Sequence, residues 1–148
     1  VAIIGPYTQE FKIKFDSFLE KTPKLQGHVE LVGNISNRNT LLSWYSRSKI
    51  LVMTSRWEGF PLVFSEAQCY GNYIISTNVS SVVEITKNLQ YGQVVDGNEK
   101  KISSAITAAI DNGICNEEMA SKIIVHAREK YDWKNALQDL HERISRKI

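Results

Sequence analysis

The chain has 148 residues, of which 43% are hydrophobic and 23% are charged, a balance that predicts a single globular domain with its own core. The formal net charge of +2 argues against a nucleic-acid-binding protein, which would carry a concentrated basic stripe. No apolar run approaches the roughly 20 residues that cross a membrane. Cys69 and Cys115 lack metal-type spacing, so we expect reduced core thiols of a cytosolic protein.

Short apolar runs alternate with amphipathic segments over the first 95 residues, and the periodicity switches repeatedly between strand and helix. The predicted strands cover residues 1–4, 28–32, 50–54, 73–77 and 92–95. The helix expected after the first strand is marked by Phe11, Phe15, Phe18 and Leu19, and the helix after the second by Leu41, Leu42 and Tyr45. A short helix is expected near Val83, and beyond Val95 the pattern is purely helical.

Strands that alternate with helices predict an α/β fold, a Rossmann-like parallel sheet with helices on both faces, because parallel neighbours need a crossover. The core of the sheet is expected to hold Ile3, Leu31, Val52 and Ile75. Ligands bind such sheets at the carboxyl ends of the strands. The loops expected to converge on one crevice there are residues 5–6, 33–34, 55–60 and 78–81. We place no domain boundary within residues 1–148.

Two glutamates, Glu58 and Glu66, are separated by seven residues across a predicted loop and the first turns of a helix. Gly59 allows close backbone approach, Pro61 suits the first helical position, and Gly71 suits the C-cap. A helix N-terminus offers unpaired N–H groups and a partial positive charge. The segment therefore predicts a site for an anionic diphosphate.

These features, in this order, resemble the C-terminal domain of family 4 glycosyltransferases, the "group 1" enzymes, over nearly the whole chain. The residues that carry the resemblance are Gly33 with the helix after it, residues 55–66, Glu66-Ala-Gln-Cys-Tyr-Gly71, Ile74-Ile-Ser-Thr77, Val83-Glu84-Ile85 and Gly92. The resemblance implies one half of a GT-B fold, in which two Rossmann-like domains transfer a sugar with retention of anomeric configuration. Residues 1–148 would be the nucleotide-sugar-binding half, with the N-terminal domain absent from this chain.

The resemblance also implies roles for the motif. Glu58 would be the catalytic residue beside the transferred sugar, and Glu66 would accept hydrogen bonds from both ribose hydroxyls. The backbone expected along sugar and pyrophosphate is that of Gly59, Phe60, Pro61, Leu62 and Val63, with Leu62 and Val63 as N–H donors. Taken singly, the two glutamates would be a solvated loop charge and a helix-dipole partner, but together in this context we favour function.

Three further positions follow from the resemblance. Ile35 would lie against the base. Ser81 stands in a segment where relatives often carry a glycine pair, and its hydroxyl would either bond phosphate or narrow the pocket. The basic Arg and Lys that meet the pyrophosphate in relatives belong upstream of Val1; Arg56 is an alternative source of charge, and a surface arginine is an equally good interpretation.

Other patterns are weaker. The three histidines share no ligand spacing, so no metal site is expected. The chain has no Asp-x-Asp pair and no G-x-G-x-x-G after the first strand, which argues against the other glycosyltransferase fold and against a dinucleotide dehydrogenase. Trp44, Trp57 and Trp133 could stack on a sugar or base, but aromatic residues at such positions usually belong to the core.

The sequence thus predicts the donor domain of a metal-independent glycosyltransferase of polysaccharide or glycoconjugate biosynthesis, with a nucleoside-diphosphate sugar as donor and no cofactor. The acceptor, a glycan or lipid-linked sugar, would bind the missing N-terminal domain, so we expect no turnover by this stretch alone. Two alternatives stay open: a non-catalytic nucleotide-sugar-binding or regulatory module, and a flavodoxin-like domain with an unrelated ligand. We expect a cytoplasmic protein, and peripheral association with the inner membrane face has no support in the sequence.

Overall fold

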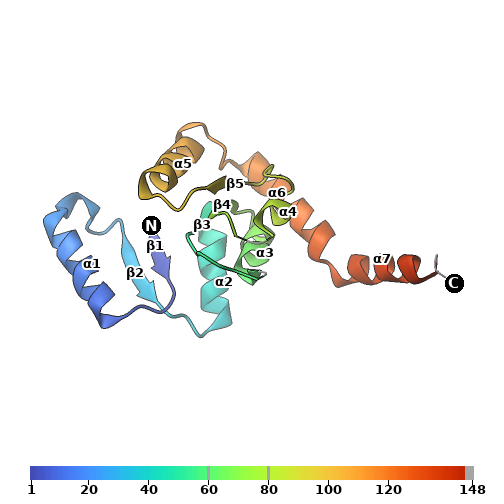
Figure 1. Ribbon diagram of the computed structural model, residues 1–148, viewed down its shortest axis with the longest axis horizontal. Helices are drawn as coiled ribbons and strands as arrows, with labels where there is room; N and C mark the ends of the chain where they lie inside the picture. The colour runs from blue at the N-terminus through green and yellow to red at the C-terminus, as the bar shows by residue number, and fades with distance from the viewer. Residues whose placement is uncertain (60, 80, 146–148) are drawn as a thin grey trace. The chain divides into compact units, whose positions relative to one another are not determined.

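The structure is a computed structural model that describes residues 1–59, 61–79 and 81–145. It divides into two compact units, Val1–Trp44 and Tyr45–Ile148. The first unit contains β1 (Ala2–Ile4), α1 (Gln9–Lys21), the 3-10 turn η1 (Pro23–Leu25), β2 (Glu30–Gly33) and the start of α2 (Arg38–Arg47). The second contains the end of α2, then β3 (Ile50–Met53), α3 (Leu62–Cys69), β4 (Tyr73–Thr77), α4 (Val82–Ile85), β5 (Gly92–Val95), α5 (Glu99–Asp111), α6 (Glu117–Tyr131) and α7 (Trp133–Ser145) (Figure 1).

The first unit is a βαβ arrangement in which β1 and β2 pair in parallel, with Ala2 opposite Glu30 and Ile3 opposite Leu31. Side-chain caps start its helices. The Thr8 hydroxyl accepts a hydrogen bond from the Phe11 N–H at 3.1 Å at the start of α1. At the start of α2, Asn37 Oδ1 accepts a hydrogen bond from the Thr40 N–H at 3.0 Å.

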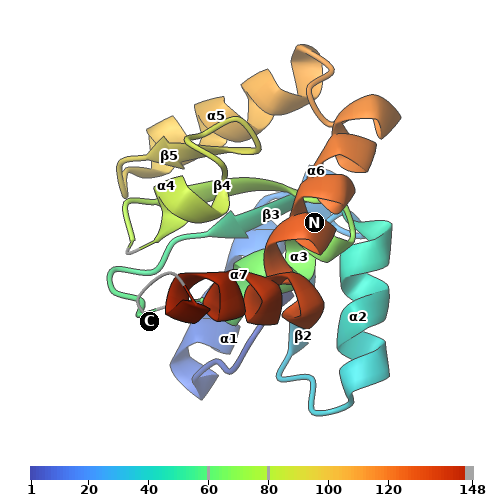
Figure 2. The same cartoon turned by 90° about the vertical axis from the view of Figure 1, so that its right-hand side faces the viewer.

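The second unit is a parallel sheet in the order β3-β4-β5 with helices on both of its faces. Figure 2 shows α5 on one side of this sheet and α3 on the other. Every residue of the central strand β4 is buried. Its alternate side chains serve two cores: Ile75 packs with α5 and α6 residues such as Ala105 and Ile123, whereas Ile74 packs with Phe64 of α3 and Ile85 of α4. The predicted parallel α/β fold is therefore confirmed.

The predicted core is only partly correct. Ile75 is fully buried and Leu31 is half-buried, but Ile3 is 36% exposed and Val52 is 39% exposed. The reason is that the strands form two small sheets, so β1 and β3 are each edge strands. In the second unit α5 packs over β4 and β5, and Val52 on β3 lies beyond that cover.

Three further expectations about burial were wrong. Cys69 is exposed on α3 rather than part of the core, whereas Cys115 is half-buried and packs against the core as expected. Partial burial raises the pKa of both thiols. Trp57 is 90% exposed and Trp133 is 79% exposed, so neither contributes to the core.

In the described ranges, none of the helices has both the length and the apolar character needed to span a membrane.

Candidate functional site

A pocket lies at the carboxyl ends of the second unit's strands, the edge of the sheet where the sequence predicts a crevice. Its volume is about 650 Å³. The residues that line it are Thr54, Ser55, Arg56 and Trp57 after β3, Thr77 and Asn78 at the end of β4, and Val95, Asp96 and Gly97 at the end of β5. The contribution of β5 was not predicted, because the sequence offers no motif there.

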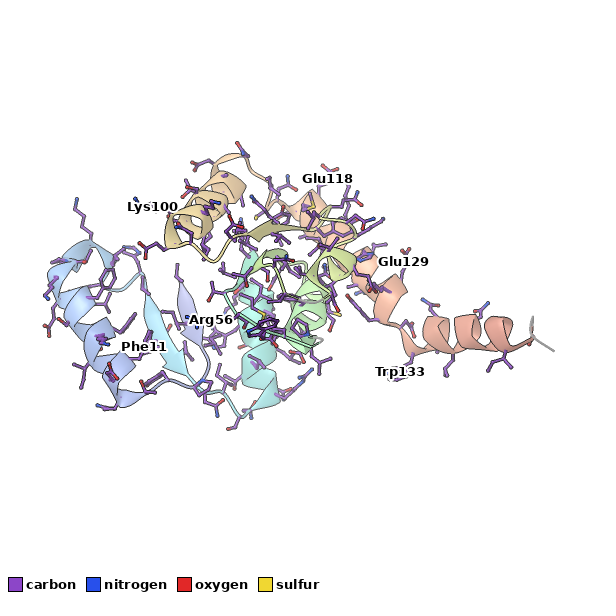
Figure 3. All side chains as sticks on the ribbon, viewed as in Figure 1. Phe11, Arg56, Lys100, Glu118, Glu129 and Trp133 are labelled. Atoms are coloured by element: carbon purple, nitrogen blue, oxygen red, sulfur yellow. The ribbon has the colours of Figure 1, made fainter. Side chains whose placement is uncertain are left out.

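The loop after β3 is tied to the end of β4. The Thr77 hydroxyl donates a hydrogen bond of 2.6 Å to the carbonyl oxygen of Ser55. Arg56, which Figure 3 labels, and Trp57 follow directly and line the pocket. Glu58 is the next residue, half-exposed and outside any helix or strand. Glu58, the predicted catalytic residue, thus directly follows a residue that lines this pocket.

The pocket's own acidic residue, Asp96, is paired. Its carboxylate accepts a hydrogen bond from the Lys101 ammonium group of α5, and both side chains are mostly exposed. This hydrogen bond lowers the pKa of Asp96 below its ordinary value. Lys101 balances Asp96, and among the described residues of the lining Arg56 carries the one further full charge.

Helix α3 begins directly after the loop, and its first turn is open. Pro61 is the N-cap rather than the predicted first helical residue, and no described side chain caps the helix there. The predicted N–H donors Leu62 and Val63 form the first turn, with Leu62 exposed and Val63 half-buried. Phe60, also predicted to line the donor, lies outside the described residues.

Glu66 lies in the middle of α3 and is held by a buried tyrosine. The Tyr45 hydroxyl donates a hydrogen bond of 3.1 Å to Glu66 Oε2. The Tyr45 ring, at the end of α2, also stacks on Tyr70, with centroids 6.2 Å apart. Sequence reasoning placed Tyr45 on the apolar face of its helix and missed this contact. The signal was a hydroxyl on a core-facing position, which needs a partner when buried.

The far end of α3 is fixed by a Schellman motif. Gly71 has φ +79, its N–H donates to the Gln68 carbonyl at 3.0 Å, and the Asn72 N–H donates to the Ala67 carbonyl at 3.1 Å. The predicted C-cap glycine is therefore confirmed. Asn72 Nδ2 also donates to the carbonyls of Tyr45 and Ser48, which joins the end of α3 to the end of α2.

The other predicted site residues lie elsewhere. Ile35 is half-buried in the loop between β2 and α2 of the first unit. Ser81 precedes α4 in the second unit, half-buried and with a left-handed φ of 68. Of the described residues, those that line the pocket do not include Glu58, Glu66 or Ser81. The single crevice shared by both glutamates therefore stays a prediction, as do the roles of all these residues.

Among the residues that the structure describes, no group of three or more His, Cys, Asp or Glu side chains could hold a metal ion.

The sequence profile described as "Glycosyl transferases group 1" matches residues 2–130 of the chain. The chain belongs to this glycosyltransferase family. The predicted family and enzyme class are thereby confirmed, and the match covers both units, from β1 through almost all of α6.

Two curated relatives match about two thirds of the chain. An uncharacterized 41.2 kDa protein in the cps region of Klebsiella pneumoniae is 35% identical over 97 residues, 65% of this chain and 26% of that protein. The D-inositol 3-phosphate glycosyltransferase of Paenarthrobacter aurescens is 30% identical over 95 residues, 64% of this chain and 23% of that protein. The chain spans about a quarter of the length of these relatives.

Solved structures agree in fold. Sucrose-phosphate synthase from Thermosynechococcus elongatus has a TM-score of 0.73 and 18% identity, covering 99% of this chain and 39% of that chain. Anabaena HepE in complex with UDP has a TM-score of 0.71 and 17% identity, covering 97% of this chain and 40% of that chain. Because these identities are below 20%, the likeness is evidence for the fold alone. It supports the predicted Rossmann-like fold, one half of a GT-B architecture.

Proposed function

We propose that this group 1 chain is the donor-binding part of a retaining glycosyltransferase, which holds a nucleoside-diphosphate sugar and transfers the sugar to an acceptor hydroxyl. The observation that carries the proposal is the construction of α3. Its first turn is open behind the Glu58 loop, and its middle presents Glu66 on a fixed helix. The UDP in the Anabaena HepE structure supports a nucleotide ligand for this fold.

The open turn of α3 suits the diphosphate. With Pro61 as N-cap, no described side chain satisfies the first N–H groups, and the helix dipole places partial positive charge beside Leu62 and Val63. These groups would bind the ground-state pyrophosphate and stabilise the negative charge that grows on it as the glycosidic bond breaks. A helix terminus thus supplies positive potential that does not require a metal ion.

Glu66 suits the ribose. A carboxylate has about four acceptor sites, so the bond from Tyr45 is compatible with hydrogen bonds from two vicinal hydroxyls. Because the Tyr45 hydroxyl approaches one oxygen, the carboxylate keeps a defined orientation before ligand binds. Preorganisation of this kind saves the entropy of ordering a long side chain on binding.

Glu58 suits the transferred sugar, because positive charge develops on the sugar ring when the leaving group departs, and a nearby carboxylate stabilises it. Ile35 would contact the base, and Ser81 would meet the phosphates or narrow the pocket. The acceptor, a glycan or lipid-linked sugar, would be bound mainly by further parts of a protein as long as the relatives. No cofactor beyond the donor substrate is required by this chemistry.

The test is a calorimetric titration of the intact protein with UDP, GDP and ADP and with the glucose conjugate of each. Glu66→Gln keeps the shape of the side chain but removes its charge, so we expect nucleotide affinity to fall about tenfold to hundredfold, the equivalent of roughly 1.5–3 kcal/mol. Glu58→Gln should leave the affinity for the bare nucleotide within about twofold while transfer falls by about a hundredfold or more.

A matched control is Glu129→Gln, a substitution of an exposed glutamate on α6 that Figure 3 labels away from α3. It should change neither affinity nor transfer. Equal losses of bare-nucleotide affinity in the Glu58 and Glu66 variants would contradict the division of roles. Tight nucleotide-sugar binding without any transfer would favour the non-catalytic module, and no nucleotide binding at all would overturn the proposal.

A further inference from the structure

Trp57 is a large aromatic side chain held in water at the rim of a polar pocket. Its exposed fraction is 90%, although indole is among the most costly side chains to leave hydrated. The neighbouring loop is not loose at its base, because Ser55 is hydrogen-bonded to Thr77 at 2.6 Å. An exposed tryptophan beside a polar pocket is well suited to ligand binding, because it combines a large apolar face with an N–H donor.

The pocket beside it is rich in groups that bind hydroxyls. Thr54, Ser55 and Asn78 offer side chains that both donate and accept, Asp96 accepts and Arg56 donates. With Asp96 balanced by Lys101, the described lining keeps one charge, that of Arg56, whose N–H donors also bind neutral hydroxyls. A neutral molecule with many hydroxyls and one apolar face fits this combination.

We infer, on the basis of the proposed function, that Trp57 and this pocket bind a pyranose ring of the acceptor. A pyranose has hydroxyls around its rim and C–H groups on its faces, and those C–H groups carry partial positive charge that complements the negative face of an aromatic ring. Trp57 would stack on such a face while Asp96, Asn78 and Arg56 bind the hydroxyls. Trp57 is then a specificity-determining residue of the glycosyltransferase.

The position of Trp57 in the chain favours the acceptor over the donor. The donor's sugar, diphosphate and ribose are assigned to Glu58, the first turn of α3 and Glu66, all of which follow Trp57. Of the described residues, those that line the pocket lie before Glu58 or from Thr77, the last residue of β4, onward, and none is Glu58, Glu66 or a residue of the first turn of α3. With the donor's groups assigned to those residues, a sugar in this pocket, next to the Glu58 loop, is assigned to the acceptor.

The experiment is saturation-transfer-difference NMR on the intact protein with methyl glycosides of glucose, galactose and mannose as probes. Each glycoside is titrated in three conditions. The first has the protein alone, the second adds a saturating amount of whichever of UDP, GDP or ADP binds, and the third adds the glucose conjugate of that nucleotide instead. We expect at least one glycoside to bind in all three conditions. Trp57→Ala should raise its Kd about fivefold or more, and Trp57→Phe, which keeps a ring, by about twofold at most.

Trp133→Ala is the matched control, because Trp133 is also highly exposed but begins α7, where Figure 3 labels it, and does not line the pocket. It should leave glycoside binding unchanged. Equal losses in the Trp133 and Trp57 variants, or no loss in Trp57→Ala, would overturn the inference.

Three results would reassign Trp57. Loss of glycoside binding when the nucleotide sugar is added, but not with the bare nucleotide, would place the donor's sugar in the pocket. A weaker bare-nucleotide affinity in Trp57→Ala would mean that the indole stacks on the base, and absence of binding by every glycoside would remove the site. Nucleotide binding is measured in the same samples, so Trp57-dependent glycoside binding without nucleotide binding would overturn the proposed function and leave the carbohydrate site.

Discussion

Glu58 and Glu66 are eight positions apart in the sequence but are held in different ways. Glu66 sits on a helix whose end is closed by a Schellman motif and whose carboxylate is bonded to Tyr45. Glu58 sits in a loop outside any regular element, next to the exposed Trp57 and after an anchor at Ser55. One carboxylate is positioned by core packing and the other by a short loop.

This difference matches the division of work proposed for the two residues. A ribose is a constant feature of every nucleotide donor, so a rigid carboxylate on a packed helix can recognise it without rearrangement. The sugar and the acceptor vary between enzymes, and loops on a rigid scaffold are where such variation is tolerated. The predictions below test how far the helix, rather than the loop, fixes nucleotide binding.

The largest effect is expected from Gly71→Ala. A Cβ at this position would lie 2.9 Å from the Ala120 Cβ and 3.0 Å from the Ala120 carbonyl oxygen of α6, and φ is +79. The left-handed backbone and the clash together should lower the free energy of unfolding by about 2–4 kcal/mol. Because α3 must shift, nucleotide affinity should fall as well. Urea unfolding and calorimetry measure the two effects.

Gly113→Ala is the control for this prediction, because Gly113 ends α5 in a Schellman motif with the same pair of hydrogen bonds. Its φ is +63, and nothing lies within 4 Å of an added Cβ. The cost should be about 1 kcal/mol from the backbone alone, with nucleotide affinity unchanged. Equal costs at the two glycines would show that the contact between α3 and α6 is not tight.

The next effect is expected from Tyr45→Phe, which keeps the ring stacked on Tyr70 and removes the hydroxyl that holds Glu66. Loss of one hydrogen bond to a half-exposed carboxylate should cost roughly 1 kcal/mol, or about fivefold in nucleotide affinity. Tyr70→Phe, on the exposed side of the same ring pair, should change affinity by less than about twofold. Unchanged affinity in both variants would mean that Tyr45 serves packing only.

Local patterns were enough to predict the elements of this fold. Every predicted strand is present, as is the cap at Gly71, because periodicity and cap chemistry depend on neighbours in sequence. Burial was predicted less well. Val52 has the composition of a core strand, yet its exposure depends on which helix covers an edge strand, and that is a property of packing between distant segments.

The site shows the same limit. The motif from Glu58 to Glu66 is continuous, so its loop and helix were predictable. The bond from Tyr45 joins α2 to α3, and the pocket includes Asp96 from the end of β5. Neither carries a sequence motif, because each contact arises only when parallel strands bring their carboxyl ends to one edge. Trp57 was expected in the core because aromatic residues usually are, but its side chain is 90% exposed.

The smallest effect is expected from Ser81→Gly, which also separates the two roles proposed for this residue. Ser81 has a left-handed φ of 68, and no described group is capped by its hydroxyl. Glycine relieves a backbone cost of about 1–2 kcal/mol but adds about 0.5–1 kcal/mol of chain entropy to the unfolded state, so the protein should be stabilised by about 0.5 kcal/mol.

Ser81→Ala removes the hydroxyl and keeps the strain, so it should not stabilise the protein. If the hydroxyl bonds phosphate, both variants should lose nucleotide affinity together. If the side chain narrows the donor site, the glycine variant should bind the nucleotide more tightly than wild type. A destabilised glycine variant would contradict the strain assigned to this position.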